Sequence, residues 1–83
     1  MPIVLTLLSR NYCHLCDEMV SGLLPLLEKF SVKLEIVDID EDAALEARYG
    51  DDVPLLLHQD VALCHYVLDA DMLIQYINSL QKA

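Results

Sequence analysis

A pair of cysteines stands where an apolar strand is expected to turn into a helix. The run from Ile3 to Leu8 is almost continuously apolar, which is typical of a strand covered on both faces. Cys13 and Cys16 follow it, and apolar residues at helical spacing begin at once. A thiol at a helix start faces unpaired backbone N–H groups and the positive end of the helix dipole, which favour thiolate over thiol. Cys13 is therefore a candidate nucleophile.

Size and charge restrict the classes of protein that fit. Eighty-three residues, 55% of them apolar, suffice for a single domain over 1–83. No apolar run approaches the roughly 20 residues that span a bilayer, and the start lacks a secretory signal, so we expect a cytoplasmic protein. We also expect a monomer. The formal charge of −9 disfavours nucleic acid and anionic membranes as partners. This acidity either keeps a leucine-rich protein soluble or selects a basic partner.

The periodicities predict a β-α-β-α-β-β-α order. Pro25 should kink its helix or make it restart, and Asp40 and Gly50 should begin and end the next helix. The first βαβ unit implies a parallel strand pair, and a later hairpin extends the sheet. We expect an α/β fold with a four-stranded mixed sheet and helices on both faces. The expected strands are 3–8, 33–39, 55–58 and 61–65, and the expected helices are 15–30, 41–49 and from about 69 onward.

Two motifs carry a resemblance to a known family. With Cys13-His14-Leu15-Cys16 after the first strand and Val53-Pro54 before the third, the chain resembles a thioredoxin-fold protein of glutaredoxin type. The resemblance spans nearly the whole chain through element order. It implies that Pro54 is cis and lies against the cysteines, and that the backbone of Val53 can bind an extended thiol substrate. Arg10 matches a basic glutaredoxin residue, which implies contact with a glutathione carboxylate.

The sequence departs from the familiar glutaredoxin pattern in two places. His14-Leu15 stands between the cysteines in place of proline and tyrosine, and Val67-Leu68 replaces a Gly-Gly pair before the last helix. Bulky side chains there would block the tripeptide or reshape its site. The acids at 51–52 form a polar turn, or they discourage anionic substrates or contact a basic one.

The favoured function is thiol–disulfide exchange on protein or glutathione disulfides. Cys13 would attack and Cys16 would release the substrate by closing the Cys13–Cys16 bond. We expect no bound cofactor, with glutathione as a candidate reductant or co-substrate. One alternative is a binding module with little exchange activity. Another is a metal-binding protein, although Cys64 and His65 are adjacent in a strand and point to opposite faces.

The remaining candidates each have two interpretations. A protonated His14 could stabilise the thiolate, or it is an exposed helix-start residue. Tyr12 flanks the substrate or packs over the strand end. Arg10 touches the ligand or is a solvated loop residue. Cys64 is interpreted as a buried strand residue rather than a third catalytic thiol. The candidate substrate-binding residues are Arg10, Tyr12, His14, Val53 and Pro54.

Overall fold

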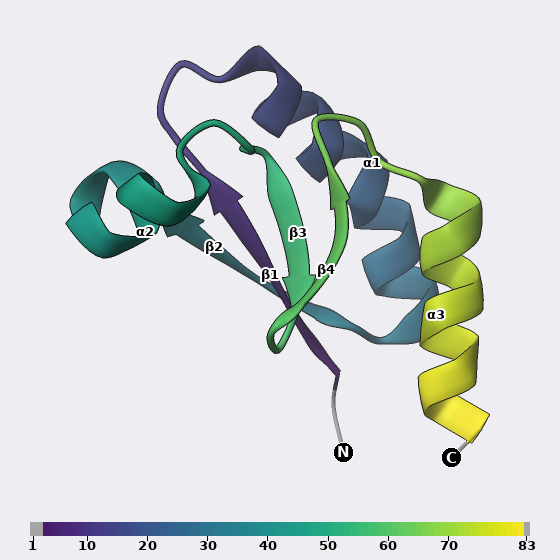
Figure 1. Ribbon diagram of the computed structural model, residues 1–83. Helices are drawn as coiled ribbons and strands as arrows, with labels where there is room; N and C mark the ends of the chain where they lie inside the picture. The colour runs from purple at the N-terminus through teal and green to yellow at the C-terminus, as the bar shows by residue number, and fades with distance from the viewer. Residues whose placement is uncertain (1–2, 83) are drawn as a thin grey trace.

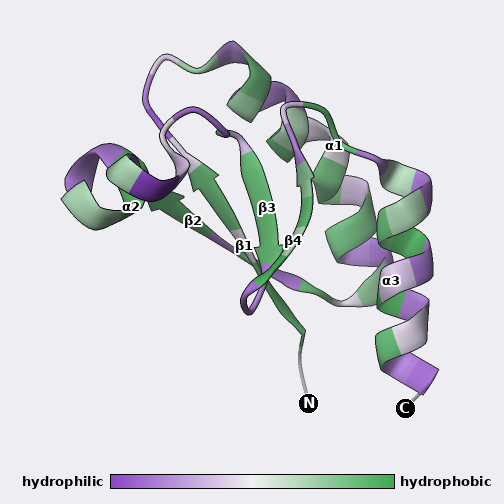
Figure 2. Cartoon of the chain, viewed as in Figure 1, coloured by the Kyte–Doolittle hydropathy of each residue, from purple (hydrophilic) through white to green (hydrophobic). Residues whose placement is uncertain are grey.

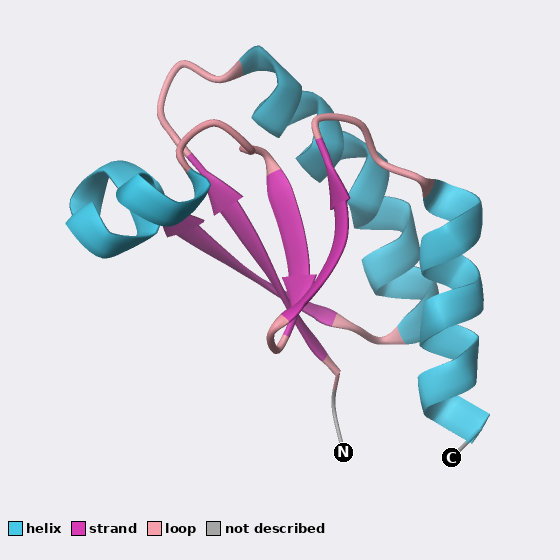
Figure 3. Cartoon of the chain, in the orientation of Figure 1, coloured by secondary structure: helices cyan, strands magenta, loops and turns pink. Residues whose placement is uncertain are grey.

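One mixed sheet organises the molecule, with strands in the order β2-β1-β3-β4. The computed structural model describes residues 3–82. β1 pairs parallel with β2 and antiparallel with β3, and β3 and β4 form a hairpin (Figure 1, Figure 3). This arrangement confirms the predicted element order. The elements are β1 (Val4–Ser9), α1 (His14–Phe30), β2 (Lys33–Asp38), the 3₁₀ turn η1 (Ile39–Glu41), α2 (Ala43–Tyr49), β3 (Leu55–His58), β4 (Val61–His65) and α3 (Ala70–Lys82).

Helices cover both faces of the sheet, as predicted. Leu5 and Leu7, two residues apart in β1, both point to the face that α1 and α3 cover, where they are fully buried. Leu8 points to the other face, where Leu45 and Tyr49 of α2 pack near it. β1 and β3 are coloured mostly hydrophobic, whereas the helices carry both hydrophobic and hydrophilic residues (Figure 2). None of the helices in the described chain is long and apolar enough to cross a membrane.

The start of α2 differs from the sequence-based expectation. Asp42, rather than Asp40, caps this helix, since its Oδ1 accepts the N–H groups of Ala44 and Leu45 at 3.0 and 3.2 Å. The preceding residues form η1 instead. Several acids in this stretch can cap a helix. Ile39 is fully buried on the α2 side of the sheet, together with Leu8 and Leu55, and this burial places Asp42 at the start of the helix.

Pro25 does not divide its helix. α1 runs without a break from His14 to Phe30, so the predicted restart is wrong. Pro25 is exposed, and the carbonyl left without its N–H partner therefore lies on the solvent side, where water can satisfy it. The packed side of the helix, which carries Met19 and Leu23, is not interrupted.

Strand register gathers the predicted site at one edge of the sheet. Ser9 at the end of β1 pairs with Asp38 at the end of β2, and Leu8 pairs with Leu55 at the start of β3. The loop that leads to Cys13, the turn η1 and the segment before β3 therefore lie at the same edge (Figure 1).

Candidate active site

Cys13 occupies the capping position of α1. Its backbone is extended, with φ −103° and ψ 105°, and its sulfur accepts the N–H of Cys16 at 3.1 Å. The carbonyl of Cys13 accepts the N–H of Asp17, which closes the first turn. The sulfur therefore sits where the unpaired amides and the positive end of the helix dipole are directed.

The two cysteines have unequal access to solvent. They are joined as a disulfide, with their Cα atoms 5.2 Å apart. Cys13 is half-buried, whereas Cys16, one turn along α1, is only 2% exposed. Cys13 is therefore the more exposed of the two cysteines. This inequality matches the roles of attacking and resolving thiol.

His14 is turned toward a neighbour on its own helix. Its Nε2 lies 3.0 Å from Oε1 of Glu18, one turn further along α1, and its side chain is 86% exposed. A carboxylate next to the imidazole offsets the charge of a protonated His14. The interpretation of His14 as an exposed helix-start residue fits this arrangement best.

The segment before β3 is tied to the turn after β4. The Val53–Pro54 bond is cis. The carbonyl of Pro54 accepts the N–H of Tyr66 at 2.9 Å, and the hydroxyl of Tyr66 donates to the carbonyl of Asp51. Pro54 is buried, and Val53 packs into the core on the α2 side. The backbone at Val53 is therefore held in place beside the end of β1.

Arg10 is already engaged by acidic side chains. Its Nη2 lies 3.4 Å from Asp40 and 3.6 Å from Glu46, which come from η1 and α2. The guanidinium is thus held toward α2 and is not a free cation of the loop. Tyr12 contrasts with it, since its side chain is fully exposed and its φ is 59°. The interpretation that Tyr12 packs over the strand end is therefore wrong.

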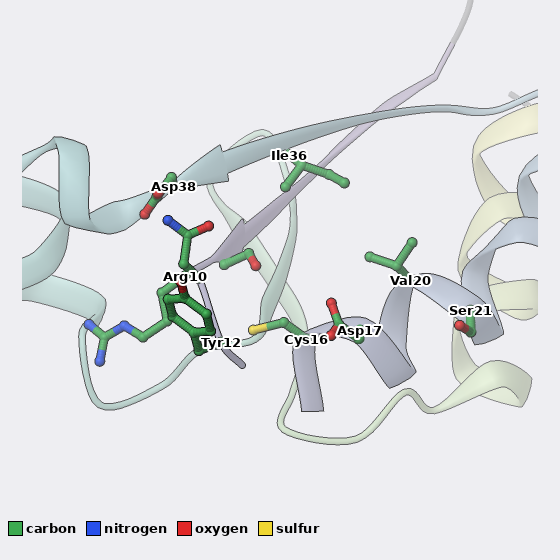
Figure 4. A pocket seen from close by; sticks show the side chains of 10 residues that line it. Arg10, Tyr12, Cys16, Asp17, Val20, Ser21, Ile36 and Asp38 are labelled. Atoms are coloured by element: carbon green, nitrogen blue, oxygen red, sulfur yellow. The ribbon is translucent and has the colours of Figure 1, made fainter. Parts of the chain in front are cut away.

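A groove of about 470 Å³ opens beside the disulfide, between α1 and the edge strand β2. The sulfur of Cys16 is directed into it, and Asp17 and Ile36 approach it from the two elements (Figure 4). Sequence reasoning missed this groove because α1 and β2 meet only in the folded chain. The lining residues are Ser9, Arg10, Asn11, Tyr12, Cys16, Asp17, Val20, Ser21, Ile36 and Asp38.

Cys64 lies in a different environment. It is a free, half-buried thiol of β4 and packs against the core formed by α1 and α3. Burial raises the pKa of this thiol, a backbone hydrogen bond with Asp69 lowers it, and the negative charge of Asp69 raises it. These features fit the interpretation as a strand residue. Between residues 3 and 82, no three His, Cys, Asp or Glu side chains gather into a group that could hold a metal ion.

Comparison with known proteins gives consistent matches. The family model described as "Glutaredoxin-like domain (DUF836)" matches residues 4–78. The solution structure of a protein from Nitrosomonas europaea is 40% identical over 92% of each chain, with a TM-score of 0.80. An X-ray structure from X. campestris is 37% identical over 90% of this chain and 96% of that one, with a TM-score of 0.71.

More distant structures show the wider fold. Deadhead, a germline-specific thioredoxin of Drosophila melanogaster, is 25% identical over 95% of this chain and 81% of its own, with a TM-score of 0.58. A search of curated proteins gave no match. The architecture is accordingly the thioredoxin-like α/β fold that the sequence predicted.

Proposed function

Because the chain belongs to the glutaredoxin-like domain family, we propose that it is a thiol–disulfide oxidoreductase whose working group is the Cys13–Cys16 pair. One observation carries the proposal: the accessible sulfur of Cys13 accepts a helix-start N–H at 3.1 Å, with Cys16 buried one turn behind it. In the reduced protein the same N–H and the helix dipole favour the thiolate of Cys13.

The exchange consists of two displacements. The Cys13 thiolate attacks one sulfur of a substrate disulfide, forms a mixed disulfide and releases the other sulfur as a thiolate, which takes a proton from water. The Cys16 thiol then loses its proton and attacks the Cys13 sulfur, which releases the second substrate thiol. Two electrons pass from the protein dithiol to the substrate. A thiol reductant, either glutathione or a protein dithiol, regenerates the pair, so the reaction needs no bound prosthetic group.

The surrounding residues would position the substrate. The Val53 backbone before Pro54 is held at the same sheet edge as Cys13 and offers hydrogen-bonding groups to an extended chain. The exposed ring of Tyr12 would flank that chain. Arg10 and His14 are paired with acidic neighbours, so neither offers a free cation to the substrate. We place this activity in the cytoplasm, on a monomer that acts on disulfide-containing proteins or glutathione.

Three variants, each with one cysteine replaced, test the proposal. Cys13→Ser should abolish reduction of a peptide disulfide, since the attacking sulfur is lost. Cys16→Ser should accumulate the mixed disulfide, detected as an adduct by mass spectrometry under non-reducing conditions. Cys64→Ser is the matched control and should retain the wild-type rate. Failure of the reduced wild type to exchange with any disulfide, or full activity in Cys13→Ser, would contradict the proposal.

A second candidate is a binding module with little exchange activity. The segment before α3 favours it, because bulky residues stand there in place of the Gly-Gly pair of familiar glutaredoxins. Val67 is largely exposed. Leu68 packs tightly over Gly22, where a Cβ would lie 3.0 Å from Leu68 Cδ2. This candidate predicts that Cys13→Ser/Cys16→Ser protein still retains a partner in pull-down. Partner binding that requires the cysteines would exclude it.

A further inference from the structure

The groove beside Cys16 combines apolar surface with negative charge. Val20 of α1 and Ile36 of β2 supply the apolar part, and Ile36 is 55% exposed although it is a large apolar side chain. Asp17 and Asp38 supply a carboxylate from each of the same two elements (Figure 4). A long side chain with an aliphatic stem and a positive end would find both kinds of contact there.

The one positive side chain that lines this groove, Arg10, is already paired with acidic residues. Its guanidinium lies near Asp40 and Glu46. No cation in residues 3–82 forms an ion pair with Asp17 or Asp38. The hydrogen bond that Asp38 accepts from the N–H of Asp40 comes from a neutral donor and leaves the carboxylate charge in place.

Two segments outside the groove also bear on which ligands the protein accepts. Asp51 and Asp52 are exposed and precede the Val53–Pro54 segment. Beyond them, Val67 and Leu68 occupy the stretch before α3, and Leu68 is packed on α1. A small anionic ligand in the groove would meet the carboxylates of Asp17 and Asp38. Glutathione, with two carboxylates and one ammonium group, is such a ligand at neutral pH.

We propose that the groove selects protein or peptide disulfides that carry a lysine or arginine beside the reacting cysteine, and that it disfavours anionic disulfides such as glutathione disulfide. The basic side chain lies along Val20 and Ile36 and directs its charge to Asp17 and Asp38. The inference rests on the proposed function and uses the same two displacements. Attraction between the acidic site and a cationic substrate raises the encounter rate and stabilises the mixed disulfide.

Matched peptides test this selectivity. Three symmetric peptide disulfides would differ at the residue before cysteine, which is lysine, glutamine or glutamate, and glutathione disulfide is the fourth substrate. Single-turnover reactions of the reduced protein, acid-quenched and resolved by chromatography, need no added reductant. The lysine peptide should react about tenfold faster than the glutamate peptide at low salt. In about 1 M salt, where the Debye length is about 3 Å, the ratio should fall to about twofold.

Variants assign the effect to the groove. Asp17→Asn/Asp38→Asn should reduce the lysine-to-glutamate ratio to about threefold, because it removes both groove carboxylates while the asparagine at 38 can still accept the N–H of Asp40. Asp60→Asn/Glu28→Gln is the matched control. It removes the same charge at the β3–β4 turn and the far end of α1, and should leave the ratio unchanged.

The possible outcomes separate the two proposals. If all substrates react at equal rates, or glutathione disulfide reacts fastest, the selectivity proposal is overturned while the oxidoreductase stands. If nothing reacts, the proposed function fails, and the selectivity proposal is tested by measuring peptide binding instead. In that arm, Cys13→Ser/Cys16→Ser protein is titrated with serine analogues of the peptides. The NMR chemical shifts of backbone amides in the groove should change with the lysine peptide and not with the glutamate peptide. An equal change with both peptides overturns the selectivity proposal.

Discussion

The regions around Cys13 and Cys64 place the same side chain in opposite surroundings. Cys13 lies at a loop-to-helix junction, half-exposed, and its sulfur accepts the N–H of Cys16. Cys64 lies within β4, where burial against the core raises its pKa and the charge of Asp69 acts in the same direction. Both sulfurs receive a backbone hydrogen bond, so this contact alone does not distinguish them. The difference comes from the helix start at Cys13 and from the core packing and the negative charge of Asp69 at Cys64.

The position of Cys13 depends on the packing of α1 against the sheet. The largest expected effect is therefore the loss of stability when a buried side chain of this helix is truncated. Leu23 is 0% exposed and Leu24 beside it is 57% exposed. Leu23→Ala should lower the free energy of unfolding by about 3 kcal/mol, from lost burial and the cavity left behind. Leu24→Ala, the control, should change it by less than about 0.5 kcal/mol. Denaturant unfolding measures both, and equal losses would show that the helix is seated differently.

The reactivities of the two thiols should differ next most strongly. At neutral pH, iodoacetamide should modify Cys13 at least about tenfold faster than Cys64 in the reduced protein. Because the pKa of Cys64 is raised, its thiolate forms only as the pH rises above the usual range for cysteine, and its modification rate should rise there. Peptide mapping by mass spectrometry follows each site separately. Comparable rates at neutral pH would remove the basis of the comparison.

A smaller effect is expected when the charge beside Cys64 is removed, which should make the reactivity of Cys64 slightly more like that of Cys13. Asp69→Asn removes the charge that raises the pKa of Cys64, while the side-chain oxygen can still accept the N–H of Met72 at the start of α3. The pKa of Cys64 should fall, and its modification between about pH 8 and 9 should become about twofold faster. Asp71→Asn serves as the control in the same turn. Slower modification in Asp69→Asn would mean that the charge acts in the opposite direction.

The smallest expected effect is at His14. Because its imidazole lies beside Glu18 and is largely exposed, His14→Gln should change the rate of Cys13 modification by less than about twofold at pH 7. Glu18→Gln is the control that frees the imidazole. A loss much larger than twofold in His14→Gln would assign the thiolate's stability to histidine rather than to the helix start.

Local patterns in the chain predicted much of the fold. The hairpin strands 55–58 and 61–65 and the helix that follows the first cysteine were predicted to within a residue. Short apolar runs next to turn residues indicate strands, and helical spacing of apolar residues indicates the buried side of a helix. Local signals were weaker at element boundaries. Several neighbouring acids could cap α2, and the burial of Ile39 selected Asp42. Pro25 reads locally as a break, yet its place on the exposed side of α1 makes it tolerable.

The sequence by itself determined where the two cysteines stand, since their spacing and the helix that follows are properties of one short segment. The tertiary structure decided what surrounds them. It paired Arg10 with Asp40 and Glu46, and it joined Asp17 of α1 to Ile36 and Asp38 of β2 in one groove. These residues are distant in sequence, and the parallel register of β1 and β2 brings them together. Charge and surface shape depend on such long-range contacts, whereas the position of a thiol at a helix start does not.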